Sequence, residues 1–432
     1  MMSKAPIALI NRENTRTVLS LADQFVISGT RFITSWMIAR YCGAEQLGYY
    51  ALGFSVLILI DLILQAFVSA PYTIFSQRIT SNRSKRYTGN SLVQSGFVGV
   101  IGISAFMAIG CFAFLAESND LANVMFVLAV SVPFCVVREF ARRHCFATEQ
   151  VGLALGFDSL FAVCQLGLMY LLLENQHLNS VTAHGAGGLA CAVALSVWLF
   201  ACRGQIELSL YRWKVNVRKH WRFGRWVFVS QTMNQLNWNI VQWIIAFWLS
   251  TEATGVFTGC LTIAFLSNPF VLGIANMIYP RLAGVQTAQG SQAMHRLAVQ
   301  ATVAIGVVMV AFTLVLLFAG QYVCDFLFSD PAYANAGLLP AILAAAVSCL
   351  AITMPFDGCL WAEHRTALSS AASALGVGVT AIAVLALVHW GTTAAAIGLL
   401  IGCAIESSAR VVFFIRSRRF SIQSSRILVL AS

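Results

Sequence analysis

Charged residues are scarce in this chain. They make up only 10% of its 432 residues, whereas hydrophobic residues account for 59%, and the mean hydropathy is +0.77. A soluble protein of this length needs far more polar side chains to cover its surface, so the composition excludes a soluble globular fold. Acidic residues are the rarer kind, with 17 Asp and Glu against 27 Lys and Arg. The sequence therefore predicts a polytopic membrane protein.

Cysteine motifs are also missing. The twelve cysteines are scattered, with no CxxC pair and no Cys/His cluster at the spacing of a metal site. Packing thiols are the simplest interpretation, so we expect neither a disulfide framework, nor a metal site, nor a bound cofactor. We also expect no cleavable secretory signal, because the first apolar stretch is long and is interrupted by Asp23 and Arg31.

Apolar windows of about 20 residues, long enough to cross roughly 30 Å of hydrocarbon, recur along the whole chain. They predict an all-α protein and not the alternating strands of an outer-membrane barrel. Pro133 and Pro269 fall inside two of the windows and could bend those helices. The twelve expected spans are residues 17–40, 47–75, 91–116, 121–141, 151–173, 181–202, 225–249, 254–279, 297–319, 335–357, 367–389 and 393–415.

Polar residues interrupt the seventh span. Eight of the fourteen residues of its segment SQTMNQLNWNIVQW, at 230–243, carry amides or hydroxyls, Asn234 among them. A helical period of 3.6 places four of the fourteen on one stripe: Gln231, Gln235, Trp238 and Gln242. A shift of 207 residues lays four residues of the first span on the same positions: Gln24, Ser28, Arg31 and Ser35. This register predicts a duplication, with one half at residues 1–210 and the other at 211–432.

Basic residues gather in alternate connections. Of the 27, 25 lie before the first span, at every second connection, or at the end of the chain, and this count includes Arg138, Arg142 and Arg410. The positive-inside rule then places both termini and these connections in the cytoplasm. The formal charge of +10 follows from this topology, so a nucleic-acid partner is not expected.

The longest basic connection, residues 203–225, mixes seven basic residues with leucines and tryptophans. Two interpretations stay open. The connection could lie along the cytoplasmic lipid surface, where basic side chains meet anionic head groups and Trp favours the interface. It could equally be an ordinary loop that links two helix bundles, since any such loop would be basic.

Arg31 lies near the middle of the first span, where a charge is costly unless it faces protein, water or a partner. Its forked, permanent cation suits a phosphate or a carboxylate. One interpretation is therefore an anion site for a substrate. The alternative is an internal ion pair with Asp23, Asp61 or Asp158.

Three intramembrane carboxylates, those of Asp61, Asp158 and Asp357, are candidates for coupling to Na⁺ or H⁺. The alternative is that each is a paired or capped carboxylate near a helix end. Glu406 and Arg410, four residues apart on the last span, are expected to pair with each other.

The amides of the seventh span also allow two interpretations. Amides can join helices inside a bundle without touching a ligand. Amides beside Trp residues are also suited to sugars, whose hydroxyls pair with amides and whose ring faces stack on aromatics. The candidate substrate-binding set is Arg31, Gln24, Ser28, Gln231, Asn234, Gln235, Trp238 and Gln242.

The segment ARYCGAEQLGYYAL, residues 39–52, resembles the signature of polysaccharide repeat-unit flippases, in which a Gly-x-Glu-x-x-Gly turn joins the first two spans. Here the turn runs from Gly43 to Gly48. The second half repeats a looser version that closes on Tyr279-Pro280-Arg281-Leu282, similar to the end of the eighth span in that family. The family makes and breaks no bonds, so no catalytic residue is implied and the chain is not expected to be an enzyme.

The resemblance implies the fold of the multidrug, oligosaccharidyl-lipid and polysaccharide exporter superfamily, with two six-helix bundles around a central cavity. It implies a place in the bacterial cytoplasmic (inner) membrane and an undecaprenyl-diphosphate-linked oligosaccharide as substrate. This substrate would be flipped from the cytoplasmic to the periplasmic leaflet by alternating access, for O-antigen, capsule or exopolysaccharide assembly. Arg31 would meet the diphosphate and the seventh span the sugars. The expected partners are this lipid-linked substrate, membrane lipids, and the polymerase and chain-length machinery.

Other functions compete with this one. A cation-coupled multidrug antiporter of the same superfamily would use the same scaffold. A major-facilitator sugar transporter also has twelve spans, but the connection at residues 76–89 lacks that family's Gly-x-x-x-Asp-Arg-x-Gly-Arg-Arg pattern. Peptidoglycan-precursor flippases typically have two more spans. Membrane polymerases or ligases of O-antigen type carry a large external loop, whereas the external connections expected here are short.

Overall fold

The computed structural model describes residues 5–77, 79, 81–209, 212–363 and 365–431. For residues 5–17, 81–82, 226, 230, 234, 276 and 417–431 it describes the backbone but not the side chains. The chain divides into two compact units, Met1–Thr232 and Met233–Ser432. The helix α8 (Trp213–Trp248) begins in the first unit and ends in the second, whereas the division expected from the sequence places all of it in the second half.

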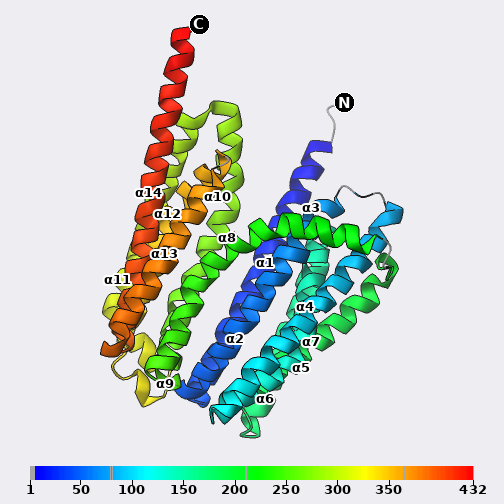
Figure 1. Cartoon of the computed structure of the whole chain (residues 1–432), viewed down its shortest axis with the longest axis vertical. Coiled ribbons are helices and arrows are strands. Elements are labelled where there is room, and N and C mark those ends of the chain that lie inside the picture. Colours follow the sequence, from blue (N-terminus) through cyan, green and yellow to red (C-terminus); the bar gives the residue numbers. More distant parts are fainter. Residues whose placement is uncertain (1–4, 78, 80, 210–211, 364, 432) are drawn as a thin grey trace. The chain divides into compact units, whose positions relative to one another are not determined.

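The first unit is a bundle in which α5 packs against α4 and α7, and α1 packs against α6 (Figure 1). Figure 1 also shows the first turns of α8 crosswise over one end of this unit, near α3. The helices are α1 (Ala5–Tyr41), α2 (Ala44–Leu64), α3 (Ala70–Ser76), α4 (Ser81–Leu115), α5 (Asn119–Ala147), α6 (Val151–Glu174) and α7 (Ser180–Cys202). Between α2 and α3 lies one π-helical turn, η1 (Gln65–Ser69), and after α7 comes the 3₁₀ turn η2 (Arg203–Gln205).

In the second unit, α12 packs against α11 and α14, and α13 packs along α14. The helices here, besides the last part of α8 from Met233 onward, are α9 (Thr251–Ala264), α10 (Asn268–Gln289), α11 (Ser291–Leu327), α12 (Leu339–Ala362), α13 (Thr366–Leu387) and α14 (Thr392–Ala431). Three 3₁₀ turns connect them, η3 (Phe265–Ser267), η4 (Pro331–Tyr333) and η5 (Val388–Trp390).

Ten helical segments within the described residues are long and apolar enough to cross a membrane. The two expected spans outside this set correspond to α1 and α8, of 37 and 36 residues, which carry the polar stripes. Each of the twelve expected spans thus corresponds to a helical segment, and the fold class expected from the sequence is confirmed. Amides and hydroxyls on α1 and α8 lower their hydropathy without preventing a helix, because every helical backbone group is satisfied within the segment.

The prolines act in two ways. Pro133 lies inside α5, which continues through it as one helix. Pro269 lies in the first turn of α10, directly after the 3₁₀ turn η3, so the eighth span stops being α-helical and restarts there. Proline has no N–H to donate and is tolerated best in the first turn of a helix. Pro71, at the start of α3 behind the π-helical turn, has the same effect in the second span.

Candidate functional site

Arg31 lies on α1 with its side chain exposed. Its guanidinium carbon is 5.6 Å from the centre of the Phe54 ring on α2. Among the described residues it forms no ion pair and no hydrogen bond. Gln24 and Ser28, on the same stripe, are half-buried. The first unit therefore presents a cation without an ion pair among the described residues, with an aromatic face below it and polar side chains along the same helix face.

Two of the three carboxylates that could have neutralised Arg31 are bound elsewhere. Asp23 accepts from Nη2 of Arg142 at 2.6 Å. Asp158, fully buried on α6, accepts from Nε of Arg142 at 2.9 Å and pairs with Arg138. The guanidinium of Arg138 in turn lies 3.8 Å from the centre of a ring on α6, that of Phe161. This buried network ties α1, α5 and α6 together, and it leaves Arg31 outside.

Asp61 on α2 is the intramembrane candidate without an ion pair among the described residues. Its Oδ2 accepts from Nε2 of Gln65 at 2.9 Å. Its Oδ1 is buried and has no hydrogen-bond partner within the described part of the chain. The positive charges of Arg143 and Arg31 are close enough to interact with it.

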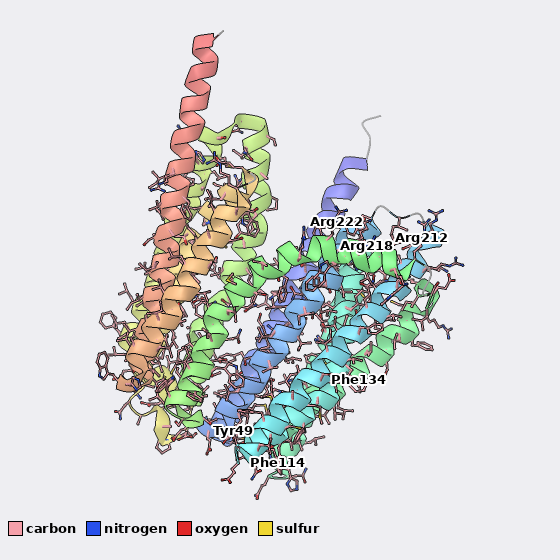
Figure 2. The ribbon with its side chains drawn as sticks, in the orientation of Figure 1. Tyr49, Phe114, Phe134, Arg212, Arg218 and Arg222 are labelled. Carbon is pink, nitrogen blue, oxygen red and sulfur yellow. The ribbon has the colours of Figure 1, made fainter. Side chains whose placement is uncertain are left out.

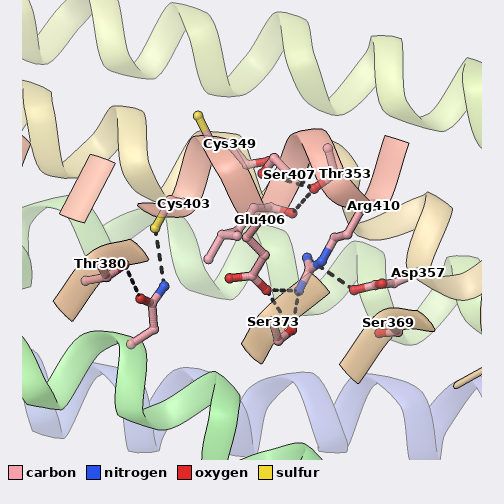
Figure 3. Close-up of polar contacts among 12 residues, drawn as sticks. Cys349, Thr353, Asp357, Ser369, Ser373, Thr380, Cys403, Glu406, Ser407 and Arg410 are labelled. Atoms are coloured by element: carbon pink, nitrogen blue, oxygen red, sulfur yellow. Dashed lines mark hydrogen bonds and ion pairs between the residues drawn. The ribbon is translucent and has the colours of Figure 1, made fainter. Parts of the chain in front are cut away.

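Asp357 lies in a second buried network, in the second unit (Figure 3). Nη1 of Arg410 is 3.1 Å from Oδ2 of Asp357, and Nη2 pairs with Glu406 one turn earlier on α14, the pair expected from the sequence. Ser373 on α13 donates to Oε1 of Glu406 at 2.7 Å. One arginine thus lies between two carboxylates and joins α12, α13 and α14, as Figure 3 shows.

The amides of α8 divide into buried and half-buried groups. Asn237, 1% exposed, accepts from Thr380 at 2.6 Å and donates to Sγ of Cys403 at 3.5 Å. Asn239 donates to the backbone carbonyl of Gln235 at 2.8 Å. Gln242, 8% exposed, donates to Thr258 at 3.4 Å. Asn237 and Gln242 thus join α8 to other helices of the second unit, as the gluing interpretation of amides describes, whereas Asn239 bonds within α8 itself.

The other candidates of this stripe are half-buried: Gln231, Gln235 and Trp238. The Trp238 ring meets that of Phe265 edge to face, with 5.3 Å between their centres. Gln231 belongs to the first unit and the other two to the second. The side chain of Asn234 lies outside the described residues. A role of these residues, and of Gln242, in substrate binding stays a prediction.

Sequence reasoning missed the part played by two arginines. Arg138 and Arg142 count among the expected cytoplasmic charges, yet in the structure both have largely buried side chains and are ion-paired. For Arg410, the expected pair with Glu406 is present, and the structure adds the ion pair with Asp357. A usable signal was their spacing: Arg138 and Arg142, like Glu406 and Arg410, stand four residues apart on a helix and so share one face. Basic residues of a surface loop, by contrast, need not be spaced so that they share one face of a helix.

The comparisons with known proteins agree with this architecture. Residues 178–331 match a family described as polysaccharide biosynthesis protein. A multidrug resistance MATE family transporter of the MOP superfamily, solved in an inward-facing conformation, has a similar fold, with a TM-score of 0.77, 18% identity, and coverage of 95% of this chain and 96% of that one. No curated protein matches the sequence significantly.

Two further solved structures have the same fold. The MATE multidrug transporter DinF-BH has a TM-score of 0.69 at 16% identity, over 94% of this chain and 96% of that one. A mutant of the Vibrio cholerae MATE transporter VcmN has a TM-score of 0.62 at 15% identity, over 96% and 98%. The chain is thus a multi-pass membrane protein with the fold of MOP-superfamily transporters, and the resemblance to the polysaccharide exporters of that superfamily is confirmed.

Proposed function

We propose that this chain is a flippase that carries an undecaprenyl-diphosphate-linked oligosaccharide across the bacterial cytoplasmic membrane. The repeat unit would serve O-antigen, capsule or exopolysaccharide assembly. The match to the polysaccharide biosynthesis family supports the glycan, and Arg31, which has no ion pair among the described residues, supports the diphosphate. The likeness to multidrug transporters supports the scaffold, with access alternating by movement of the two units.

Arg31 is the observation that carries the proposal. Two phosphates cannot cross hydrocarbon without a partner that replaces their water. A guanidinium offers five donors in a planar fork that matches phosphate oxygens, and Arg31 keeps all of them unused by the described residues. Because Asp23 and Asp158 are held by Arg138 and Arg142, binding of a diphosphate to Arg31 need not break an existing ion pair.

The sugar part of the substrate needs amides and aromatic faces that are still available. Gln24 and Ser28 on α1 and Gln231, Gln235 and Trp238 on α8 are half-buried and can change partners at low cost. Gln242 already bonds to Thr258 and would have to exchange that bond. We therefore assign the hydroxyls of the sugar to the half-buried residues first.

Asp61 is the best of the three coupling candidates. Asp158 and Asp357 are bound by arginines, so a cation or a proton would have to displace a buried ion pair. Asp61 has an oxygen with no partner among the described residues and only Gln65 on the other. Na⁺ or H⁺ would bind there if a gradient drives transport.

Both termini would lie in the cytoplasm, and the polymerase and chain-length machinery would take up the product.

The test is flipping of a fluorescent polyprenyl-diphosphate oligosaccharide in proteoliposomes. Loss of one charged hydrogen-bonding partner costs about 1.5–3 kcal/mol, so Arg31→Ala should slow transport by roughly 10- to 100-fold. The transport rate of Arg31→Lys should lie between those of the native chain and Arg31→Ala, because lysine keeps the charge and lacks the planar fork of donors. Arg281→Ala, which removes an exposed arginine of α10, serves as the matched control and should transport normally.

Two outcomes would contradict the proposal. Arg31→Ala could be folded and transport at the native rate, which removes Arg31 as the anion site. Alternatively, the native chain could fail with the sugar of its own pathway and instead move small cationic drugs under an ion gradient, which would favour the antiporter.

A further inference from the structure

The connection between the halves is docked onto the first unit. The backbone N–H of Glu207 donates to the carbonyl of Lys85 at 3.1 Å, and its carboxylate accepts from Nε of Arg86 at 2.8 Å. Gly89 permits this approach, because a Cβ there would lie 2.0 Å from the carbonyl oxygen of Glu207. The segment is therefore held against α4 just before α8 begins.

The inner face of the first turns of α8 is equally well fixed. His220, 1% exposed, lies between two side chains of α4: the Tyr87 hydroxyl is 2.7 Å from its Nε2, and Oε1 of Gln94 is 2.7 Å from its Nδ1. Four residues later, Gly224 allows close contact with η1, since a Cβ there would lie 2.4 Å from the carbonyl oxygen of Ala66. One face of this helix is thus committed to the first unit.

The opposite face carries a row of cations. Lys214, Arg218 and Arg222 follow one another at intervals of four, so they form a single ridge, and all three side chains are exposed. Figure 2 shows Arg218 and Arg222 on the crosswise part of α8. None of the three forms an ion pair with a described residue. Like charges four apart on a helix destabilise it, so this ridge would gain from an anionic partner.

The position along α4 at which α8 crosses it indicates that the first turns of α8 lie at the edge of the membrane. Its contacts fall between Tyr87 and Phe97, and Trp213 packs on Phe97 with 5.5 Å between the rings. The apolar span expected from the sequence starts at residue 91, within this stretch. The helix also exposes large apolar side chains beside the cations, with Val215 61% and Trp221 60% exposed. Cations, valine and tryptophan together are typical of the boundary between head groups and acyl chains.

We propose that the ridge of Lys214, Arg218 and Arg222 binds the head groups of anionic phospholipids, with Val215 and Trp221 inserted beside them. Of the two interpretations of the basic connection, this proposal takes the one that places it along the lipid surface. A soluble acidic protein or a nucleic acid would leave those apolar side chains without a suitable environment. The ridge binds lipid at the end of the first unit whatever substrate the chain transports, so the inference does not depend on the flippase proposal.

The test compares two triple variants of the full chain in detergent, titrated with phosphatidylglycerol and, separately, with phosphatidylcholine. Bound lipid is counted by native mass spectrometry. Replacement of Lys214, Arg218 and Arg222 by Gln should weaken phosphatidylglycerol binding roughly tenfold or more, because it removes all three cations of the proposed site. The control replaces Arg83, Lys85 and Arg203, exposed cations elsewhere in the first unit, by Gln and should bind nearly as the native chain does.

Several results would overturn the inference. Equal losses in the two triple variants would show a diffuse charge effect and no site. Equal binding of phosphatidylcholine and phosphatidylglycerol by the native chain would show that charge is not recognised. A ridge variant that binds phosphatidylglycerol normally but loses binding of farnesyl diphosphate would assign the ridge to a lipid diphosphate instead. Native-like thermal unfolding of both variants without added lipid is the check on folding.

Discussion

Nη2 of Arg142 on α5 lies 2.6 Å from Oδ2 of Asp23 on α1. The same guanidinium holds Asp158 on α6, so one side chain links three helices of the first unit. Arg31 lies two turns along α1 from Asp23 and takes no part in this network. The structure thus separates the intramembrane charges that hold helices together from Arg31, which has no ion pair among the described residues.

Asp158→Asn should destabilise the protein without abolishing coupling to an ion. Removal of one charge from a buried network leaves its partners uncompensated and costs about 3–5 kcal/mol, here at Arg138 and Arg142. Thermal unfolding in detergent, followed with a thiol-reactive dye, measures the loss. Glu117→Gln, at an exposed position, is the control and should unfold like the native chain. Native stability combined with loss of gradient dependence would make Asp158 the coupling residue.

Loss of the hydrogen bond to Asn237 and loss of the Gln235 amide should have different effects on stability and transport, although the two residues lie two positions apart on α8. Asn237 accepts from Thr380, so Thr380→Val leaves a buried oxygen unpaired and should cost about 1–3 kcal/mol of stability, with transport by the remaining folded protein unchanged. Gln235→Leu should have the reverse effect, slower transport at native stability, because its side chain is half-buried. Unfolding and flipping assays on both variants make the comparison. Identical behaviour of the two would disprove the division of the amides.

Stability should fall in acid because of His220. Burial, reinforced by the charge of Lys219, lowers the pKa of His220 from 6.5 to about 4, although a hydrogen bond with the backbone of Phe67 opposes the shift. The unfolded chain therefore takes up a proton between pH 6.5 and 4 while the folded chain does not. The contribution of neutral His220 to the free energy of unfolding is complete above pH 6.5 and falls by about 3 kcal/mol towards pH 4.

The measurement is the unfolding temperature against pH for the native chain and for His220→Gln. The variant should be less stable at pH 7.5 and should show a flatter decline between pH 6.5 and 4.5. His177→Gln, at an exposed histidine, should keep the native slope. An unchanged slope in His220→Gln would show that other groups cause the acid sensitivity.

Two glycines should respond to alanine with opposite signs. In Gly224→Ala the new Cβ would overlap the carbonyl oxygen of Ala66, so α8 must shift away from η1 at a cost of about 1–3 kcal/mol. Gly284 lies in α10 with open space around it, and Gly284→Ala should be neutral or stabilising by up to about 1 kcal/mol. Unfolding temperatures of the two variants test the pair. Equal effects would mean that α8 does not rest on η1 as closely as described.

Much of the fold could be predicted from the sequence because a membrane span depends on local properties. Length and hydropathy suffice to place twelve helices, and the positions of Pro133 and Pro269 were visible as candidates for bends. Whether a bend occurs was not visible. Pro133 sits within a continuous helix while Pro269 restarts one, since the outcome depends on which neighbours satisfy the freed backbone groups.

The sequence by itself determined that this protein spans a membrane, that it is duplicated in pattern, and that polar side chains mark the first and seventh spans. Only the tertiary structure decided which of these side chains are already bound. Asn237 meets Thr380 across 143 positions, and Asp158 meets Arg138 on a neighbouring helix, so neither partner could be chosen from local pattern. A buried polar group must find a partner, but the packing of distant helices selects which one. That selection left Arg31 without an ion pair among the described residues.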